Sequence, residues 1–154
     1  MKIRRAKISD AENIQTLISQ YAELDRMLPR SLADIYENLQ SFLVAEDDKG
    51  LVSGCCALQV IWSDLAEIKS LAVRQDSTGR GTGRALVEAA LREAENLGLE
   101  RVFTLTLEPG FFERLAFTKV EKDELPMKVW SDCAKCSKQD NCDEVALIYN
   151  MGPS

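Results

Sequence analysis

The sequence predicts a single domain of the mixed α/β class. Segments with apolar residues at helical spacing alternate along the chain with short runs rich in valine, leucine and isoleucine, and glycine or proline separates them. The chain of 154 residues is long enough to bury a hydrophobic core. It contains no internal repeat, no low-complexity tract and no interdomain linker. We therefore expect residues 1–154 to fold as one unit.

The first half of the chain predicts two helices and four strands. Leu17, Ile18 and Tyr21 belong to an apolar pattern of helical spacing, which favours an amphipathic helix that residues 27–30 end. The same spacing recurs in the next segment, and apolar, strand-like runs follow it. The expected helices span 10–24 and 31–40, and the expected strands span 2–6, 42–46, 51–61 and 65–73.

The second half is expected to begin with a helix from about Gly83 to Asn96, which stops at Gly98, a residue type common just after helix ends. A strand, a short helix and two further strands are expected at 101–106, 109–115, 117–120 and 145–149. The segment 121–143, between the last two strands, is polar, and we expect it to be irregular.

Composition limits the possible partners and the compartment. The chain has 25 acidic and 19 basic residues and a formal net charge of -6, which argues against nucleic-acid or anionic-membrane binding. No apolar region follows the charged residues 1–10, so a signal peptide is not indicated. No apolar run approaches the length of a membrane span. These features favour a cytoplasmic protein without membrane or nucleic-acid partners.

The five cysteines fall into two groups. Cys55 and Cys56 lie in an apolar run and are expected to be small core residues. Cys133, Cys136 and Cys142 have the spacing C-x2-C-x5-C, which resembles half of a metal site. The chain has no histidine, and structural zinc needs four firm ligands, so an acidic residue, water or another cysteine would have to complete the site. We expect reduced thiols or an occasional disulfide there, and no bound metal.

A glycine-rich loop lies between a predicted strand and a predicted helix. Residues 78–84 read Thr-Gly-Arg-Gly-Thr-Gly-Arg. The first amides of a helix lack internal partners and lie at the positive end of its dipole, and glycines let a phosphate approach them closely. A P-loop would require a lysine after the last glycine, and the spacing does not fit a dinucleotide fold. The loop therefore indicates another kind of phosphate ligand.

Two stretches together resemble a known superfamily. The segment "LAEIKSLAV" at 65–73, followed by "TGRGTG" at 78–83, resembles the central strand and pyrophosphate loop of the GCN5-related N-acetyltransferases. "FFERLAF" at 111–117 is similar to a later helix and strand entry of that superfamily. The resemblance implies a mixed central sheet flanked by helices, with acetyl-CoA bound where the central strands splay. Thr78 departs from the usual glutamine or arginine at its position.

A narrower resemblance is to the acetyltransferase domain of N-acetylglutamate synthases, particularly short single-domain versions. It rests on "MLPRSLADIYENL", "GCCALQVIWSDLAEIKSLAV" and "DELP" and covers about the first four-fifths of the chain. It implies transfer of acetyl to the α-amine of L-glutamate, the first step of arginine biosynthesis. The kinase-like domain of longer relatives is absent from this sequence, and the cysteine-bearing region departs from the better-known members. The choice between glutamate and glutamine, and a possible homodimer, stay open.

The resemblance also implies roles for individual residues. Glu67 takes the place of the general base, acting directly or through water, although it could instead pair with Lys69. The amide near Leu71 would meet the tetrahedral oxyanion. The pantetheine would pair with Leu71, Ala72 and Val73 as an added strand. The residues expected to bind the pyrophosphate are Thr78, Gly79, Arg80, Gly81, Thr82, Gly83 and Arg84.

A glutamate acceptor needs cationic partners for its two carboxylates. Arg30, in the loop between the first two helices, is our first candidate because that segment lines the acceptor site in the superfamily. Lys69 is the second candidate, because it lies two residues after Glu67 and side chains two residues apart on a strand point to the same face. Lys128 and Arg26 are weaker candidates. Phe112 stands where many relatives have a tyrosine that protonates the leaving sulfur, and a thiol with a pKa of ~8.5 can leave as thiolate without it.

Two other functions remain open from the sequence. The chain could acetylate another amine, such as a protein N-terminus, an aminoglycoside or a polyamine. It could instead be a non-catalytic acyl-CoA sensor, or a metal-binding interaction module that uses the C-terminal cysteines. Thiol release from acetyl-CoA with L-glutamate and with simple amines separates these possibilities.

Overall fold

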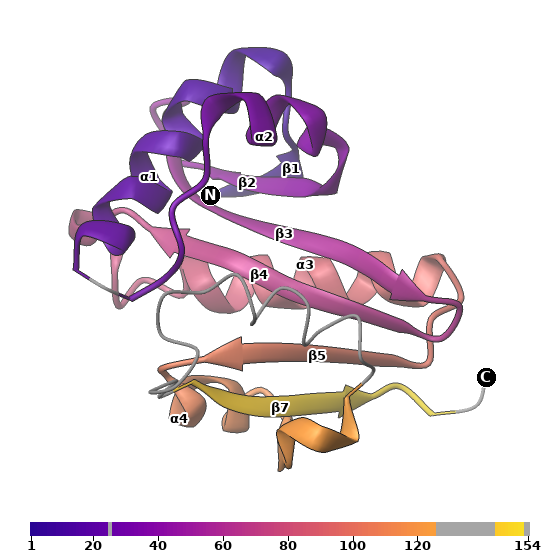
Figure 1. The fold of residues 1–154 in the computed structure, drawn as a ribbon. Coiled ribbons are helices and arrows are strands. Elements are labelled where there is room, and N and C mark those ends of the chain that lie inside the picture. Colours follow the sequence, from indigo (N-terminus) through magenta and orange to yellow (C-terminus); the bar gives the residue numbers. More distant parts are fainter. Residues whose placement is uncertain (25, 126–143, 153–154) are drawn as a thin grey trace.

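The strands form one seven-stranded mixed sheet. The computed structural model describes residues 1–24, 26–125 and 144–152. The strand order is β1-β2-β3-β4-β5-β7-β6, and every neighbouring pair is antiparallel except β4 and β5, which are parallel (Figure 1). The strands are β1 (Lys2–Arg5), β2 (Phe42–Glu46), β3 (Val52–Trp62), β4 (Leu65–Val73), β5 (Arg101–Thr106), β6 (Thr118–Val120) and β7 (Val145–Asn150). The mixed sheet predicted from the resemblance is confirmed.

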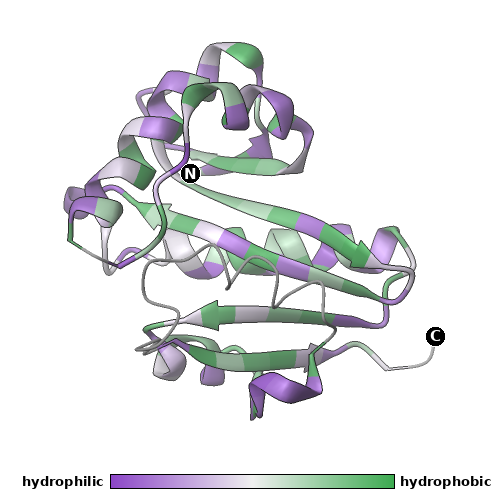
Figure 2. Ribbon diagram, viewed as in Figure 1, coloured by the Kyte–Doolittle hydropathy of each residue, from purple (hydrophilic) through white to green (hydrophobic). Residues whose placement is uncertain are grey.

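Helices cover both faces of this sheet. One face carries α1 (Ala11–Glu23) and α2 (Leu32–Glu37), and the other carries α3 (Thr82–Asn96) and α4 (Pro109–Glu113) (Figure 1). The two faces have separate cores. Ile14 and Ile18 of α1 pack with Phe42, whereas Leu86 of α3 packs with Ile68. The longer strands β2, β3 and β7 are accordingly hydrophobic over most of their length, as Figure 2 shows.

The predicted elements are present with small shifts at their ends. Several of these shifts occur where the chain forms a short 3-10 turn. The turns are at Ile8–Asp10, Leu39–Ser41, Gln75–Ser77 and Lys122–Glu124. The helix predicted at 31–40 ends at Glu37, because the Asn38 side chain bonds the Asp34 carbonyl and the chain then tightens into a 3-10 turn. Helix α3 begins at Thr82, one residue before the expected Gly83. Most of the expected irregular segment, from residue 126 to 143, lies outside the described residues.

The start of α1 is fixed to the first strand by a partly buried ion pair. Nη1 of Arg4 lies 2.8 Å from Oδ2 of Asp10, and Nη2 lies 3.1 Å from Oδ1. The backbone amide of Lys7 donates to the same carboxylate at 2.7 Å. The hydrogen bond from Arg4 holds the pKa of Asp10 below its ordinary value. Asp10 thus anchors the turn from which α1 begins.

Candidate functional site

The two parallel strands at the centre of the sheet separate halfway along their length. Leu65 to Glu67 of β4 pair with Arg101 to Phe103 of β5, and within the described strands this ladder ends there. Just beyond it, Oγ1 of Thr104 donates to the Ile68 carbonyl at 2.9 Å and so bridges the point of separation. The rest of β4 runs on to Val73 without β5 at its side. This is the splay that the resemblance predicted.

A β-bulge follows in the separated part of β4. Ser70 and Leu71 together oppose Cys56 of β3, and Ser70 has a φ of 56°, a conformation that non-glycine residues seldom adopt. The extra residue reverses the alternation of side chains. Glu67 therefore precedes the bulge on the same face as Ala72 after it, whereas Leu71 packs into the core beneath α3. The bulge lies at the position predicted to hold the oxyanion.

The end of β4 presents its backbone groups away from β3. The Arg74 amide donates to the Ser53 carbonyl at 2.8 Å, so in an antiparallel pair the neighbouring Val73 must direct its N–H and C=O to the other side. Both groups are occupied by a side chain from α1. The Tyr21 hydroxyl donates to the Val73 carbonyl at 2.9 Å and accepts from its amide at 3.3 Å. Sequence reasoning treated Tyr21 only as a helix residue.

Glu67, the predicted base, belongs to the last pair of the ladder. It lies between Gln59 of β3 and Phe103 of β5, and only 8% of the residue is exposed. A carboxylate buried at the point where two strands separate is a strong candidate for chemistry. Lys69, two residues along and before the bulge, is half-buried on the same face. The two residues are thus placed together as the sequence predicted.

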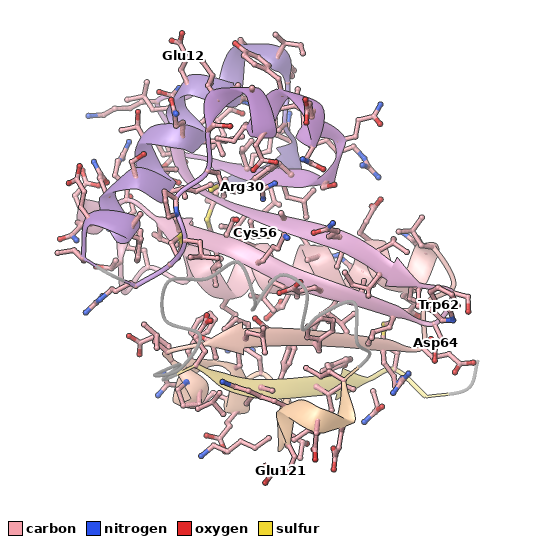
Figure 3. The ribbon with its side chains drawn as sticks, viewed as in Figure 1. Glu12, Arg30, Cys56, Trp62, Asp64 and Glu121 are labelled. Atoms are coloured by element: carbon pink, nitrogen blue, oxygen red, sulfur yellow. The ribbon has the colours of Figure 1, made fainter. Side chains whose placement is uncertain are left out.

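Arg30 reaches the bulge from the segment before α2 (Figure 3). Its Nε lies 2.6 Å from Oδ2 of Asp34, and its Nη1 donates to Oγ of Ser70 at 3.2 Å. The guanidinium lies over the Phe42 ring at 5.0 Å, and only 12% of the side chain is exposed. The hydrogen bond from Arg30, with a smaller contribution from Lys69, lowers the pKa of Asp34, so this carboxylate stays ionised. The four-residue spacing of Arg30 and Asp34 is the sequence signal that could have revealed the pair.

The glycine loop has the backbone conformation that its composition indicated. Gly79 and Gly81 have φ values of 79° and 80°, and Gly81 is the N-cap of α3. The first internal helix bond joins the Ala85 amide to the Gly81 carbonyl, so the amides before Ala85 have no partner four residues back. These amides face outward at the positive end of a 15-residue helix. The site suits a phosphate ligand.

Not every side chain of the loop is available to a ligand. The Thr82 side chain is buried against Gly54 of β3. A Cβ added to Gly54 would lie 3.1 Å from the methyl carbon of Thr82. A Cβ on Gly83 would lie 3.3 Å from the Phe111 ring, so this glycine also serves packing. Thr78 donates its hydroxyl to the Gln75 carbonyl at 2.9 Å. The backbone of these residues, rather than their side chains, is what the loop offers.

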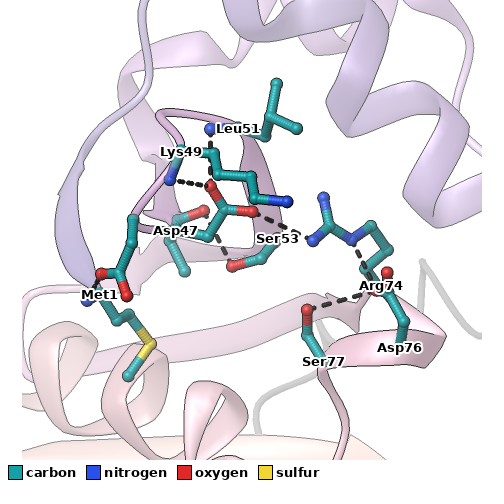
Figure 4. A network of polar contacts seen from close by, with 10 residues as sticks. Met1, Asp47, Lys49, Leu51, Ser53, Arg74, Asp76 and Ser77 are labelled. Atoms are coloured by element: carbon teal, nitrogen blue, oxygen red, sulfur yellow. Dashed lines mark hydrogen bonds and ion pairs between the residues drawn. The ribbon is translucent and has the colours of Figure 1, made fainter.

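The arginines of the loop differ in their partners. Arg84 pairs with Glu88 one turn along α3 at 2.6 Å, and Arg80 is exposed. Arg74, just before the loop, joins it to the turn between β2 and β3. It bonds Asp47 at 3.1 Å and Asp76 at 2.7 Å, as Figure 4 shows. This network holds the entry of the loop against the sheet.

The remaining candidates have structural roles or lie elsewhere. Phe112 is 3% exposed and packs edge-on against Phe111 and Phe117. Cys55 and Cys56 are buried as expected, and burial raises the pKa of Cys55 to about 12. Arg26 is exposed, and Lys128 lies outside the described residues, as do Cys133, Cys136 and Cys142.

The described part of the chain has neither a candidate metal site nor a helix that could span a membrane. Among residues 1–24, 26–125 and 144–152, no group of three or more histidine, cysteine, aspartate or glutamate side chains is placed to hold a metal ion. Within the same ranges no helix has the length and apolar character needed to cross a membrane.

Comparison with known proteins identifies relatives over most of the chain. The model of the acetyltransferase (GNAT) family matches residues 8–117. An uncharacterised N-acetyltransferase of Chlorobaculum tepidum is 42% identical over 149 residues, which make up 97% of this chain and 96% of that protein. The amino-acid acetyltransferase of Mycobacterium tuberculosis is 42% identical over 152 residues, covering 97% of this chain and 80% of that protein.

A solved structure has the same fold. The N-acetylglutamate synthase of Neisseria gonorrhoeae, complexed with coenzyme A and N-acetyl-glutamate, matches with a TM-score of 0.89 at 27% identity. The match covers 99% of this chain and 35% of the longer synthase. The matched part of this chain includes β4, β5 and the glycine loop described above.

Proposed function

The chain belongs to the acetyltransferase (GNAT) family, and we propose that it transfers acetyl from acetyl-CoA to the α-amine of an amino acid, L-glutamate first among them. The observation that carries this proposal is the position of Glu67 in the last pair of the β4–β5 ladder. The buried Glu67 carboxylate lies between the open edge of β4, where a thioester could bind, and the face of the sheet near Arg30. Cofactor and acceptor would meet beside it.

The cofactor would lie along β4 and end at the helix α3. The pantetheine would lie along Leu71, Ala72 and Val73 and extend the sheet as an added strand. Val73 directs its amide and carbonyl to this open side, whereas the alternation of the strand turns those of Ala72 toward β3. The pyrophosphate would be received by the outward amides between Gly79 and Arg84. Arg80 and Arg84 add positive charge beside them, and Arg84 would exchange its exposed pair with Glu88 for the ligand.

The chemistry needs a proton acceptor and a place for negative charge. Glu67 would take the proton of the acceptor ammonium, directly or through a water, so that the free amine attacks the thioester carbonyl. The amide of Leu71 at the bulge would donate to the oxygen that becomes negative. The buried Phe112 has no proton to give, and a thiolate of pKa ~8.5 is an adequate leaving group near neutral pH.

Charge at the acceptor side favours an acidic amino acid. Arg30 and Lys69 are both on the face of β4 that α2 covers, and the Nη1 edge of Arg30 is directed to the bulge. Asp34 accepts hydrogen bonds from Nε and Nη2 of Arg30, and Nη1 donates one N–H to Ser70, so the second N–H of Nη1 is the one that would donate to a substrate carboxylate. The names of the relatives support this choice, since one is an amino-acid acetyltransferase and another was solved with N-acetyl-glutamate. A role in arginine biosynthesis in the cytoplasm would follow from this substrate.

The test is a substrate survey. Purified protein and acetyl-CoA are mixed with each proteinogenic amino acid, with polyamines and with short peptides, and released thiol is measured. We expect the highest kcat/KM with L-glutamate, less with L-glutamine and little with polyamines, because a cation would meet Arg30 and Lys69. The highest kcat/KM with a peptide or polyamine would instead support acetylation of another amine. Binding of acetyl-CoA without thiol release from any acceptor would contradict an enzymatic role.

A further inference from the structure

We propose that Tyr21 is a residue of the cofactor site: in the free protein its hydroxyl occupies the backbone groups of Val73 that the cofactor takes when it binds. Tyr21 would thereby set the affinity for coenzyme A. The inference rests on the proposed function, because it assumes that the pantetheine pairs with the open edge of β4.

The position of the hydroxyl carries the argument. The Arg74 amide bonds Ser53 of β3, so the groups of Val73 are directed to the edge of β4 that β5 has left. The Tyr21 oxygen lies 2.9 Å from the Val73 carbonyl oxygen and 3.3 Å from its amide nitrogen. This single oxygen therefore occupies both polar groups that Val73 has for pairing on that side.

A tyrosine hydroxyl can replace an added strand at one residue. It has one proton to donate and lone pairs that accept, so it satisfies an N–H and a C=O at the same time. An amide chain laid along β4 would use the same N–H and C=O. Val73 has only one amide proton, so the Tyr21 oxygen and a pantetheine carbonyl cannot both accept it in a linear bond.

Competition of this kind lowers the apparent affinity of the cofactor. If only a fraction of the free molecules has Val73 unoccupied, the apparent Kd rises by the inverse of that fraction. Tyr21 lies near the end of α1, which stops at Glu23, and its ring is half-buried. An open depression of about 480 Å³ lies nearby, lined by residues 20, 23 and 24 at the end of α1 and by residues 74–76 before the glycine loop. The ring also packs against the core beneath α1, so a variant that keeps the ring is needed to test the hydroxyl alone.

The experiment removes the hydroxyl and keeps the ring. Coenzyme A is titrated by calorimetry into the wild type, Tyr21→Phe and the control Tyr36→Phe, whose ring is exposed on α2. We expect the Kd of Tyr21→Phe to fall about three- to tenfold, which corresponds to one or two lost intramolecular hydrogen bonds, and that of Tyr36→Phe to stay unchanged. Amide exchange at Val73, followed by NMR, should become faster in free Tyr21→Phe and slow again on addition of coenzyme A.

The outcomes separate this inference from the function on which it rests. An unchanged Kd in Tyr21→Phe, with tight binding to the wild type, would overturn the role of Tyr21 and leave the proposed function intact. A higher Kd would make Tyr21 a direct ligand of the cofactor and overturn the competition. If coenzyme A bound neither protein, the proposed function itself would fail, and this inference with it.

Discussion

Glu67 and Phe103 face each other as the last pair of the parallel ladder between β4 and β5. From this pair onward the sheet is open on one side of β4, and the opening ends at the glycine loop where α3 begins. A buried carboxylate at one end and the amides of a helix N-terminus at the other define a path along a single strand.

The first prediction concerns Glu67. Replacement by glutamine keeps the size of the side chain but removes its ability to take a proton. We expect kcat for L-glutamate to fall by ~10²-fold or more, the usual range for loss of a general base, with the Kd for coenzyme A unchanged. Activity should recover at high pH, where the free amine is already abundant. Glu12→Gln, on the exposed surface of α1, is the control. Activity of Glu67→Gln within threefold of wild type at neutral pH would remove Glu67 from the mechanism.

The second prediction concerns Gly81. Its φ of 80° is a conformation that a β-branched residue adopts only with strain, and Gly98 at the other end of α3 has a φ of 84°. Neither position has a heavy atom within 4 Å of an added Cβ. Gly81→Val and Gly98→Val should therefore lose similar stability, about 1–2 kcal/mol.

Only the change at Gly81 should affect the cofactor, because only there would the displaced amides face its phosphates. We expect its Kd for coenzyme A to rise about tenfold or more, the effect of losing one charge-assisted hydrogen bond. Thermal shift with and without coenzyme A measures stability and binding together. Equal ligand-induced shifts in the two variants would count against a phosphate-binding loop. Gly83→Val is a poorer test, because its side chain would press on Phe111.

The third prediction concerns the ion pair of Arg4 and Asp10. The folded-state pKa of Asp10 is held below its ordinary value of 3.8, chiefly by the hydrogen bond from Arg4. A lowered pKa contributes stability that is present above the ordinary value and is lost as the pH falls through the folded-state value. Asp10→Asn should lower the free energy of unfolding by about 1–3 kcal/mol at pH 7.

The difference between Asp10→Asn and the wild type should shrink as the pH falls below 3.8, the ordinary pKa of the group. Urea unfolding at several pH values measures it. Asp48→Asn is the control, since that side chain is 97% exposed and bonds only the chain terminus among the described contacts. A difference that stayed constant from pH 7 to pH 3 would show that charge on Asp10 is not what stabilises the turn.

Most of the fold, and the conformation of the glycine loop, could be predicted from the sequence. The helical spacing of apolar residues located the helices, and continuous apolar runs located the strands, which helices cover on both faces. The glycines at 79 and 81 indicated a loop with unusual backbone. Glu67 and Lys69 were placed together because two residues along a strand share a face. These inferences depend only on residues that are close together in the sequence, so local sequence patterns are enough to make them.

Relationships between distant segments could not be predicted in the same way. The contact of Tyr21 with Val73 joins residues 52 positions apart, and it depends on where α1 ends relative to the edge of β4. The bulge at Ser70 depends on the register with β3, and nothing in the strand's composition indicates an extra residue. Arg30 was chosen for its loop, but its pair with Asp34 and its bond to Ser70 required the packing of α2 on the sheet.

The last prediction concerns Arg30 and decides the acceptor. The guanidinium is held in one orientation by Asp34 and by the Phe42 ring, so it presents a fixed edge at the bulge. A charged hydrogen bond to a substrate carboxylate is worth ~1.5–3 kcal/mol, and 1.4 kcal/mol is tenfold in affinity. Arg30→Ala should therefore raise KM for L-glutamate by about ten- to a hundredfold, whereas KM for acetyl-CoA should barely change.

Arg30→Lys should restore only part of this loss, because lysine keeps the charge but has no planar fork to bond Asp34 and the substrate together. Arg101→Ala is the matched control: this arginine is also paired with an aspartate, Asp64, but at the opposite end of the parallel ladder. It should leave both KM values unchanged. If Arg30→Ala left the glutamate kinetics unaltered, or impaired both substrates equally, Arg30 would be a residue of the α2 packing alone. The acceptor would then have to be recognised by Lys69 or by groups that have yet to be assigned.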